Sequence, residues 1–155
     1  MAGQIDARLK ELGIEIPTVA KPAAAYVPGV RTGNLIFVSG QVPFVNGELA
    51  YKGKVGAEFT VEQGQECARV CALNAIAVAK DMLGGDLDKV TRVVKLGGFV
   101  NCPADFEQHP MVINGASNVV GEIFGDKGAH SRFAVGVGSL PFNVAVEVEA
   151  VFEVE

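Results

Sequence analysis

Arg132 is the residue whose chemistry most needs a partner. It opens the run RFAVGVGSLP, which carries no other charge. A guanidinium group stays charged at any physiological pH, and burying it without an anion is costly. Its partner is either a carboxylate of this chain, with Glu147 as the candidate, or the carboxylate of a small ligand held by two parallel hydrogen bonds.

The three cysteines do not suggest a metal centre. Cys67 and Cys71 lie four residues apart in a helical pattern, but neither histidine stands at a ligand spacing from them. Cys71 fits the apolar face of that helix, and Cys102 has no basic sequence neighbour that would activate its thiol. We therefore expect structural cysteines, no metal, and a reducing, cytoplasmic setting.

The two histidines are His109 and His130. Their spacing does not favour a nuclease that uses one histidine as base and the other as acid. His130 stands two residues before Arg132, so we expect it to line whatever pocket Arg132 serves. The sequence also lacks a phosphate-binding loop, a dinucleotide fingerprint, a GxSxG elbow and an HExxH motif.

Hydrophobic periodicity predicts the elements that position these side chains. Apolar residues spaced three or four apart predict helices over 4–12, 60–83 and 111–124, and Thr60 with Gln63 has the spacing of a capping box. Strands are expected as a hairpin over 26–40, a short pair around Asn46-Gly47, and runs over 90–100, 132–137 and 145–154. Gly97 and Gly98 mark a bulge or a close approach.

Composition fits one compact domain over residues 1–155, with 49% hydrophobic residues and a mean hydropathy of +0.30. A net charge of −5 argues against nucleic acid as a partner, and no apolar run is long enough for a membrane helix. The last strand alternates apolar residues with glutamates, but the other strands carry little charge. A sheet that lacks a polar face is usually buried, so we expect another subunit to cover part of it.

Three motifs in order resemble the reactive intermediate deaminase (RidA) family, also known as endoribonuclease L-PSP. They are YVPGVRTGNLIFVSGQVP at 26–43, SRFAVGVGSLP at 131–141 and VEVEA at 146–150. The resemblance covers about residues 22–155, and residues 1–21 look like the N-terminal helical extension of a longer subgroup. It implies an α+β, chorismate-mutase-like fold, a mixed sheet with two main helices on one face. It also implies a homotrimer with active sites between subunits, which uses neither metal nor organic cofactor.

The resemblance further implies a reaction and its residues. Members hydrolyse enamine and imine intermediates such as 2-iminobutanoate and 2-iminopropanoate to 2-keto acids and ammonia, so the expected partner is a small imino or keto acid. Arg132 matches the residue that grips the substrate carboxylate, and Glu147 matches the one that orients or activates water. The remaining matches line the cleft: Tyr26 from a neighbouring subunit, Ser39, Gly40, and either Asn114 or Asn118.

The sequence departs from the family pattern at several points. Ala134 stands where relatives often carry a cysteine, His130-Ser131 replaces a common Pro-Ala pair, and Gly97-Gly98 replaces bulkier residues. Three alternatives to the deaminase remain open. One is a non-catalytic trimer that binds a small carboxylic acid, and another is an endoribonuclease, against which the acidity of the chain counts. The third is a protein-holding or translation-related role.

Overall fold

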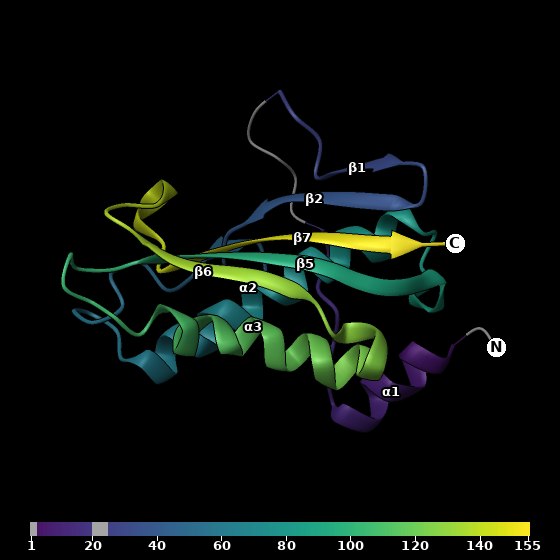
Figure 1. Ribbon diagram of the computed structural model, residues 1–155, viewed down its shortest axis with the longest axis horizontal. Helices are drawn as coiled ribbons and strands as arrows, with labels where there is room; N and C mark the ends of the chain where they lie inside the picture. Colours follow the sequence, from purple (N-terminus) through teal and green to yellow (C-terminus); the bar gives the residue numbers. More distant parts are fainter. Residues whose placement is uncertain (1–2, 20–24) are drawn as a thin grey trace.

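A five-stranded mixed sheet forms the centre of the molecule (Figure 1). The structure is a computed structural model that describes residues 3–19 and 25–155. The strand order is β1-β2-β7-β5-β6. Only β5 and β6 run parallel, and the other neighbours are antiparallel. The strands are β1 Gly29–Thr32, β2 Leu35–Gln41, β5 Val90–Asn101, β6 Ser131–Val137 and β7 Val146–Val154, with a separate hairpin of β3 Phe44–Val45 and β4 Glu48–Leu49. The expected mixed α+β fold is confirmed.

Two helices cover one face of this sheet, α2 Val61–Met82 and α3 His109–Phe124. The predicted capping box begins α2, since Thr60 accepts from the Gln63 N–H and the Gln63 side chain accepts in return. The helices approach closely at Gly115, where any Cβ would strike the backbone of Gln65. Neither they nor any other helix of the described residues is long and apolar enough to span a membrane.

The N-terminal helix α1 Gln4–Leu12 packs near α3 and the short 3-10 turn η1 Leu87–Lys89. Its first N–H groups lack a capping side chain from the preceding residue. Asp88 fills that role from a distance, accepting from the backbone N–H groups of Gln4 at 2.9 Å and Ile5 at 2.8 Å. The expected extension 1–21 is thus tied to the domain, and its residues 1, 2, 20 and 21 lie outside the described residues.

The strand ladders differ from the sequence expectation in one detail. Gly97 and Gly98 keep regular register with both neighbouring strands, and they are the expected close approach, lying against Phe133 and Ile113 respectively. The register shifts in β5 fall earlier, between Val90 and Arg92 and between Val93 and Lys95. A further shift lies in β2 between Val38 and Gln41, where two residues oppose one on β7. Two further short 3-10 turns complete the chain, η2 Gly125–Gly128 and η3 Pro141–Asn143.

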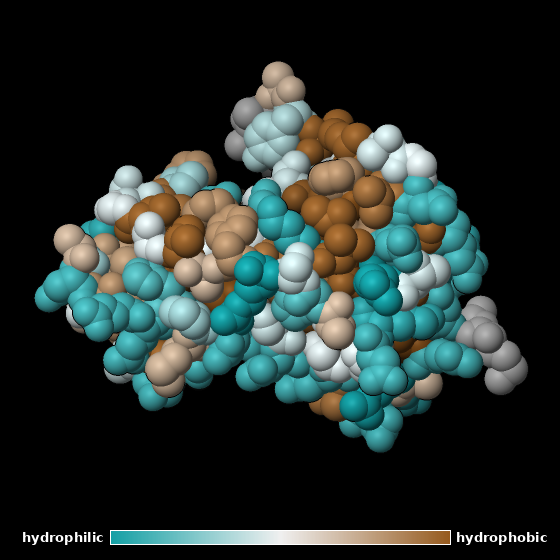
Figure 2. Space-filling view, viewed as in Figure 1, coloured by the Kyte–Doolittle hydropathy of each residue, from teal (hydrophilic) through white to brown (hydrophobic). Residues whose placement is uncertain are grey.

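The sheet face opposite α2 and α3 carries exposed apolar side chains. Val30, Phe37 and Val135 each expose more than two fifths of their surface there. Figure 2, which shows this face, has brown apolar surface over β1 and β2 and again near β6 and η3, with a polar band between. We call it the open face.

Candidate functional site

Arg132 lies on the helix-covered side of edge strand β6. It shares a cross-strand row with the buried residues Leu96 and Ala150. Its Nη1 donates to Asn114 Oδ1 at 2.8 Å and to Ser117 Oγ at 3.1 Å, and its Nη2 donates to the Pro110 carbonyl at 3.1 Å. All three acceptors belong to α3, which therefore fixes the guanidinium plane.

The charge of Arg132 has no internal counter-ion among the described residues. Its three acceptors are an amide, a hydroxyl and a carbonyl oxygen, all neutral. The ion pairs within the described residues join Arg8 to Glu11 and Arg69 to Glu122. An internal salt bridge from Arg132 to Glu147, one of the two sequence alternatives, is therefore wrong.

Arg132 also keeps unused hydrogen-bond donors. A guanidinium has five N–H groups, and three are engaged, which leaves Nε–H and one N–H of Nη2. A half-buried cation with two free donors is the arrangement that a carboxylate ligand satisfies.

Behind Arg132, Ser117 connects to His130 in a directed chain of hydrogen bonds. His130 Nδ1 lies 2.6 Å from the Gly128 carbonyl, which only accepts, so Nδ1 carries the proton. Nε2 is then the acceptor for the Ser117 hydroxyl at 2.9 Å. The hydroxyl proton therefore points away from Arg132 and leaves Oγ lone pairs facing the guanidinium. We call Arg132, Asn114, Ser117 and His130 the arginine half-site.

Glu147 lies on the open face, as the alternation of β7 predicted. Its carboxyl group sits over Gly40 of the β2 bulge, and any Cβ at Gly40 would strike it. Burial raises the pKa of the Glu147 carboxyl above its ordinary value, and the neighbouring Glu149 carboxylate raises it further. A carboxyl with a raised pKa is suited to proton transfer near neutral pH.

Ser39 connects this region to the segment before β1. Its Oγ donates to the Val27 carbonyl at 2.8 Å, and its N–H donates to the Pro28 carbonyl at 2.8 Å. Tyr26, next in this segment, is 54% exposed. We call Glu147, Gly40 and Ser39 the acidic half-site; Tyr26 stays a predicted cleft residue.

The two half-sites do not meet within one chain. Glu147 pairs across β5 with Phe99 and Val135 on the open face, whereas Arg132 points to the helix side. Strands β7 and β6 are separated by β5, about 10 Å apart at ordinary sheet spacing. A four-carbon imino acid spans roughly 5 Å, so one such molecule cannot touch both residues in the same chain.

The structure also separates the two candidate asparagines. Asn114 holds Arg132, whereas Asn118, one turn further along α3, is exposed and is not among the acceptors of Arg132. Sequence reasoning missed Ser117 and the Pro110 carbonyl. Ser117 follows Asn114 by three residues, the spacing that places two side chains on one helix face, and that signal would have found it.

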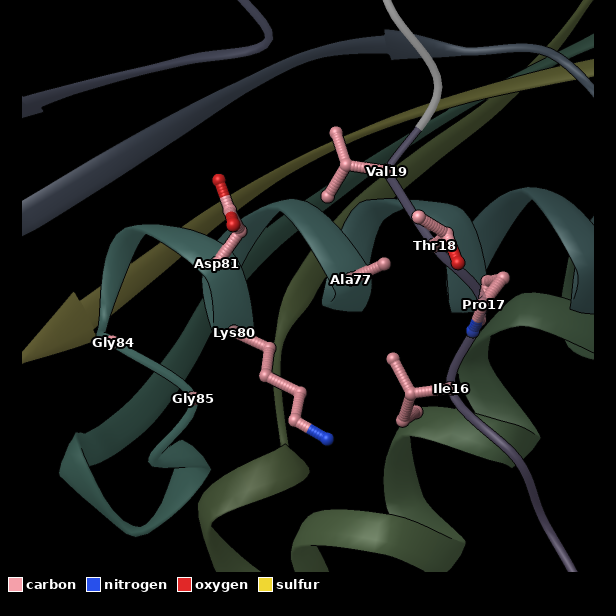
Figure 3. A pocket seen from close by; sticks show the side chains of 9 residues that line it. All are labelled: Ile16, Pro17, Thr18, Val19, Ala77, Lys80, Asp81, Gly84 and Gly85. Carbon is pink, nitrogen blue, oxygen red and sulfur yellow. The ribbon is translucent and has the colours of Figure 1, made fainter.

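Separate cavities border the N-terminal segment 14–19. One of about 340 Å³ lies between this segment and the end of α2, and Figure 3 shows Ile16 and Lys80 both directed into it. Its lining holds one lysine and one aspartate and neither half-site. The described residues contain no cluster of three or more side chains suited to a metal ion.

Comparisons with known proteins agree with this fold. Residues 6–154 match the family described as "YjgF/chorismate_mutase-like, putative endoribonuclease". Protein TCP17 of Trypanosoma cruzi is 45% identical over 153 residues, covering 98% of this chain and 95% of that protein. The crystal structure of Atu1372 from Agrobacterium tumefaciens, a protein of unknown function, is 46% identical with a TM-score of 0.91, covering 97% of this chain and 92% of that one.

A third relative carries an enzymatic name. The 2-iminobutanoate/2-iminopropanoate deaminase of Escherichia coli (strain K12) is 33% identical over 139 residues, covering 88% of this chain and 94% of that protein.

Proposed function

The chain belongs to the YjgF/chorismate mutase-like family, and on this premise we propose that it hydrolyses reactive 2-imino acids to 2-keto acids and ammonia. The observation that carries the proposal is the uncompensated charge of Arg132, whose three bonded acceptors are neutral. The name of the Escherichia coli relative supports the substrate class.

Arg132 receives the substrate carboxylate. Its free Nε–H and Nη2–H groups donate to the two carboxylate oxygens, while α3 holds the other side of the guanidinium. The carboxylate supplies the missing counter-charge, so binding relieves the cost of a half-buried cation.

Glu147 activates the water that attacks. Its carboxylate takes a proton from water as the oxygen adds to the imine carbon. The C=N electron pair moves to nitrogen, which takes that proton from Glu147. The hydroxyl proton of the resulting carbinolamine then passes to nitrogen, and ammonia leaves as the C=O bond forms. Positioning provides most of the acceleration, because imines already hydrolyse in water.

The working site is made by two copies of the chain in a homotrimer. Arg132 of one copy and Glu147 of the next contribute to each site, since the two lie on opposite faces in one chain. The apolar open face supports this arrangement, because an exposed sheet face with Phe37 and Val135 is typical of a subunit interface.

A competition assay tests this function. 2-Iminobutanoate is generated in place from threonine by a dehydratase and trapped with semicarbazide. The rate of semicarbazone formation is measured with and without the protein. The wild-type chain should compete for the imine and Arg132→Ala should not. Failure to compete, with a folded trimer and imines of several amino acids tried, contradicts the proposal.

The alternative is a trimer that binds a small carboxylic acid without turnover. It needs Arg132 but not Glu147, so calorimetry with 2-oxobutanoate distinguishes the two: binding without any hydrolysis favours the alternative. The endoribonuclease in the family description fits this chain less well, because its net charge is −5.

A further inference from the structure

A thiol and an imidazole lie side by side beyond the arginine half-site. Cys102 directly follows β5, His109 begins α3, and Cys102 Sγ lies 3.5 Å from His109 Nε2. The ring of Phe106 packs edge-on against the imidazole with centroids 5.2 Å apart, which orients the ring. The sequence showed no basic neighbour for Cys102, and the fold supplies one.

Strand β6 leaves room for this pair at Gly136. A Cβ there would strike His109 Nε2 and come within 2.9 Å of Cys102 Sγ. The same region borders a cavity of about 340 Å³. Its lining is Cys102, Pro103, Ala104, Phe106, His109, Gly136, Val137 and Gly138. The cavity is therefore apolar apart from the thiol, the imidazole and the backbone, and it includes neither half-site.

The protonation state of Cys102 suits a base-assisted thiol. Burial raises the pKa of the Cys102 thiol; the Val137 N–H and the charge of Lys54 work in the other direction without cancelling it. Lys54 itself does not line the cavity; it donates to Asn101 Oδ1 at 2.7 Å and to the carbonyl of Gly138, a lining residue, at 2.6 Å. Cys102 is thus a neutral thiol at pH 7 and needs a base within reach to become a nucleophile.

We propose that Cys102 and His109 form a covalent trapping site for small α,β-unsaturated carbonyl compounds. His109 Nε2 takes the thiol proton as Sγ bonds to the β-carbon of the electrophile. The C=C electron pair moves to the α-carbon, which then receives that proton from the imidazolium. The product is a thioether, all atoms of both reactants are retained, and no further reagent is consumed. This site is independent of the deaminase proposal.

Alkylation of the native protein by methyl vinyl ketone tests the site. Peptide mass mapping should find the adduct on Cys102, which borders the cavity, and not on Cys67 or Cys71, both fully buried. His109→Gln keeps a polar side chain but loses the base, and should slow the reaction at Cys102 on the order of 100-fold at pH 7. At a pH above the pKa of the thiol, Cys102 is already a thiolate, so the two proteins should react at similar rates.

Glu107→Gln is the matched control, since it changes an exposed side chain two residues before His109 that does not line the cavity, and it should leave the rate at Cys102 unchanged. Circular dichroism verifies that each variant folds. The wild-type protein gives a second test that needs no variant: if Cys102 reacts no faster than Cys67 and Cys71, the proposal is overturned. An unchanged rate in folded His109→Gln overturns it as well.

Discussion

Arg132 and Glu147 point to opposite faces of the same sheet, with strand β5 between them. Each is prepared for one task. Arg132 is held by neutral acceptors on α3 and keeps two donors for an anion, while Glu147 sits over Gly40 with a raised pKa. If both residues act on one small substrate, as we propose, a second copy of the chain must supply one of them.

Arg132→Lys tests whether binding needs the planar guanidinium group, with its two parallel donors, as well as the positive charge. Lysine keeps the charge but cannot donate two parallel hydrogen bonds. We expect kcat/KM for 2-iminobutanoate to fall on the order of 100-fold, mostly through a higher KM, because a charge-assisted hydrogen bond to substrate is lost. Steady-state kinetics measure this, and an unchanged KM would show that the carboxylate binds elsewhere.

Asn114→Ala and Asn118→Ala form a matched pair on α3. Asn114 holds Arg132 at 2.8 Å, whereas Asn118 is exposed. Loss of the Asn114 amide should release one side of the guanidinium and raise KM about tenfold, the cost of one hydrogen bond to a charged group. Asn118→Ala should behave like wild type. Equal effects of the two changes would remove Asn114 from the site.

Glu147→Gln separates binding from turnover. The variant should still bind 2-oxobutanoate in calorimetry, yet its kcat should fall at least 100-fold without the general base. In the wild type, kcat should decline as pH falls through the raised pKa of Glu147, above the ordinary value of 4.5. A profile flat down to pH 4.5, or full activity in the variant, contradicts the role of Glu147.

Glu147→Gln should lower turnover but raise the stability of the fold at neutral pH. A carboxyl whose pKa is raised on folding stabilises the fold in its protonated form, below the unfolded pKa, and this contribution is lost as pH rises through the folded pKa. Glutamine mimics the protonated form, so Glu147→Gln should raise the Tm at pH 7 and give no gain below pH 4.5. Glu153→Gln, at an exposed position of β7, is the control.

Asp88→Ala should loosen the N-terminal helix. Desolvation raises the pKa of the Asp88 carboxyl, but hydrogen bonds from the Ile5 and Gln4 N–H groups lower it, and the net pKa lies below its ordinary value. Its stabilisation is therefore present above the unfolded pKa and is lost as pH falls through the folded one. We expect a loss of about 1 kcal/mol in urea unfolding at pH 7. The exposed acid Asp81, changed to asparagine, should show no comparable loss.

Local signals in the sequence predicted most of the elements. The Thr60 capping box and the apolar spacing of α2 needed only neighbouring residues, and the alternation of β7 placed Glu147 on the correct face. The α3 helix begins two residues earlier than predicted, at His109, because Pro110 fits the first turn of a helix.

Contacts between distant segments were beyond those signals. The Asp88 cap of α1 joins residues more than 80 positions apart, and the neutral environment of Arg132 depends on how α3 packs against β6. The neighbourhood of Cys102 follows from the same packing, which brings His109 and Gly136 together. No periodic pattern in the sequence predicts any of these contacts.

Complementation between two inactive variants tests the composite site most directly. Arg132→Ala and Glu147→Gln are each purified, unfolded together in equal amounts and refolded, and imine hydrolysis is measured by semicarbazide competition. If each site combines Arg132 of one copy with Glu147 of the next, every mixed trimer holds one intact site, and random assembly predicts about a quarter of wild-type activity. If no activity returns although mixed trimers are shown by mass spectrometry, the two residues do not act across subunits and the account is contradicted.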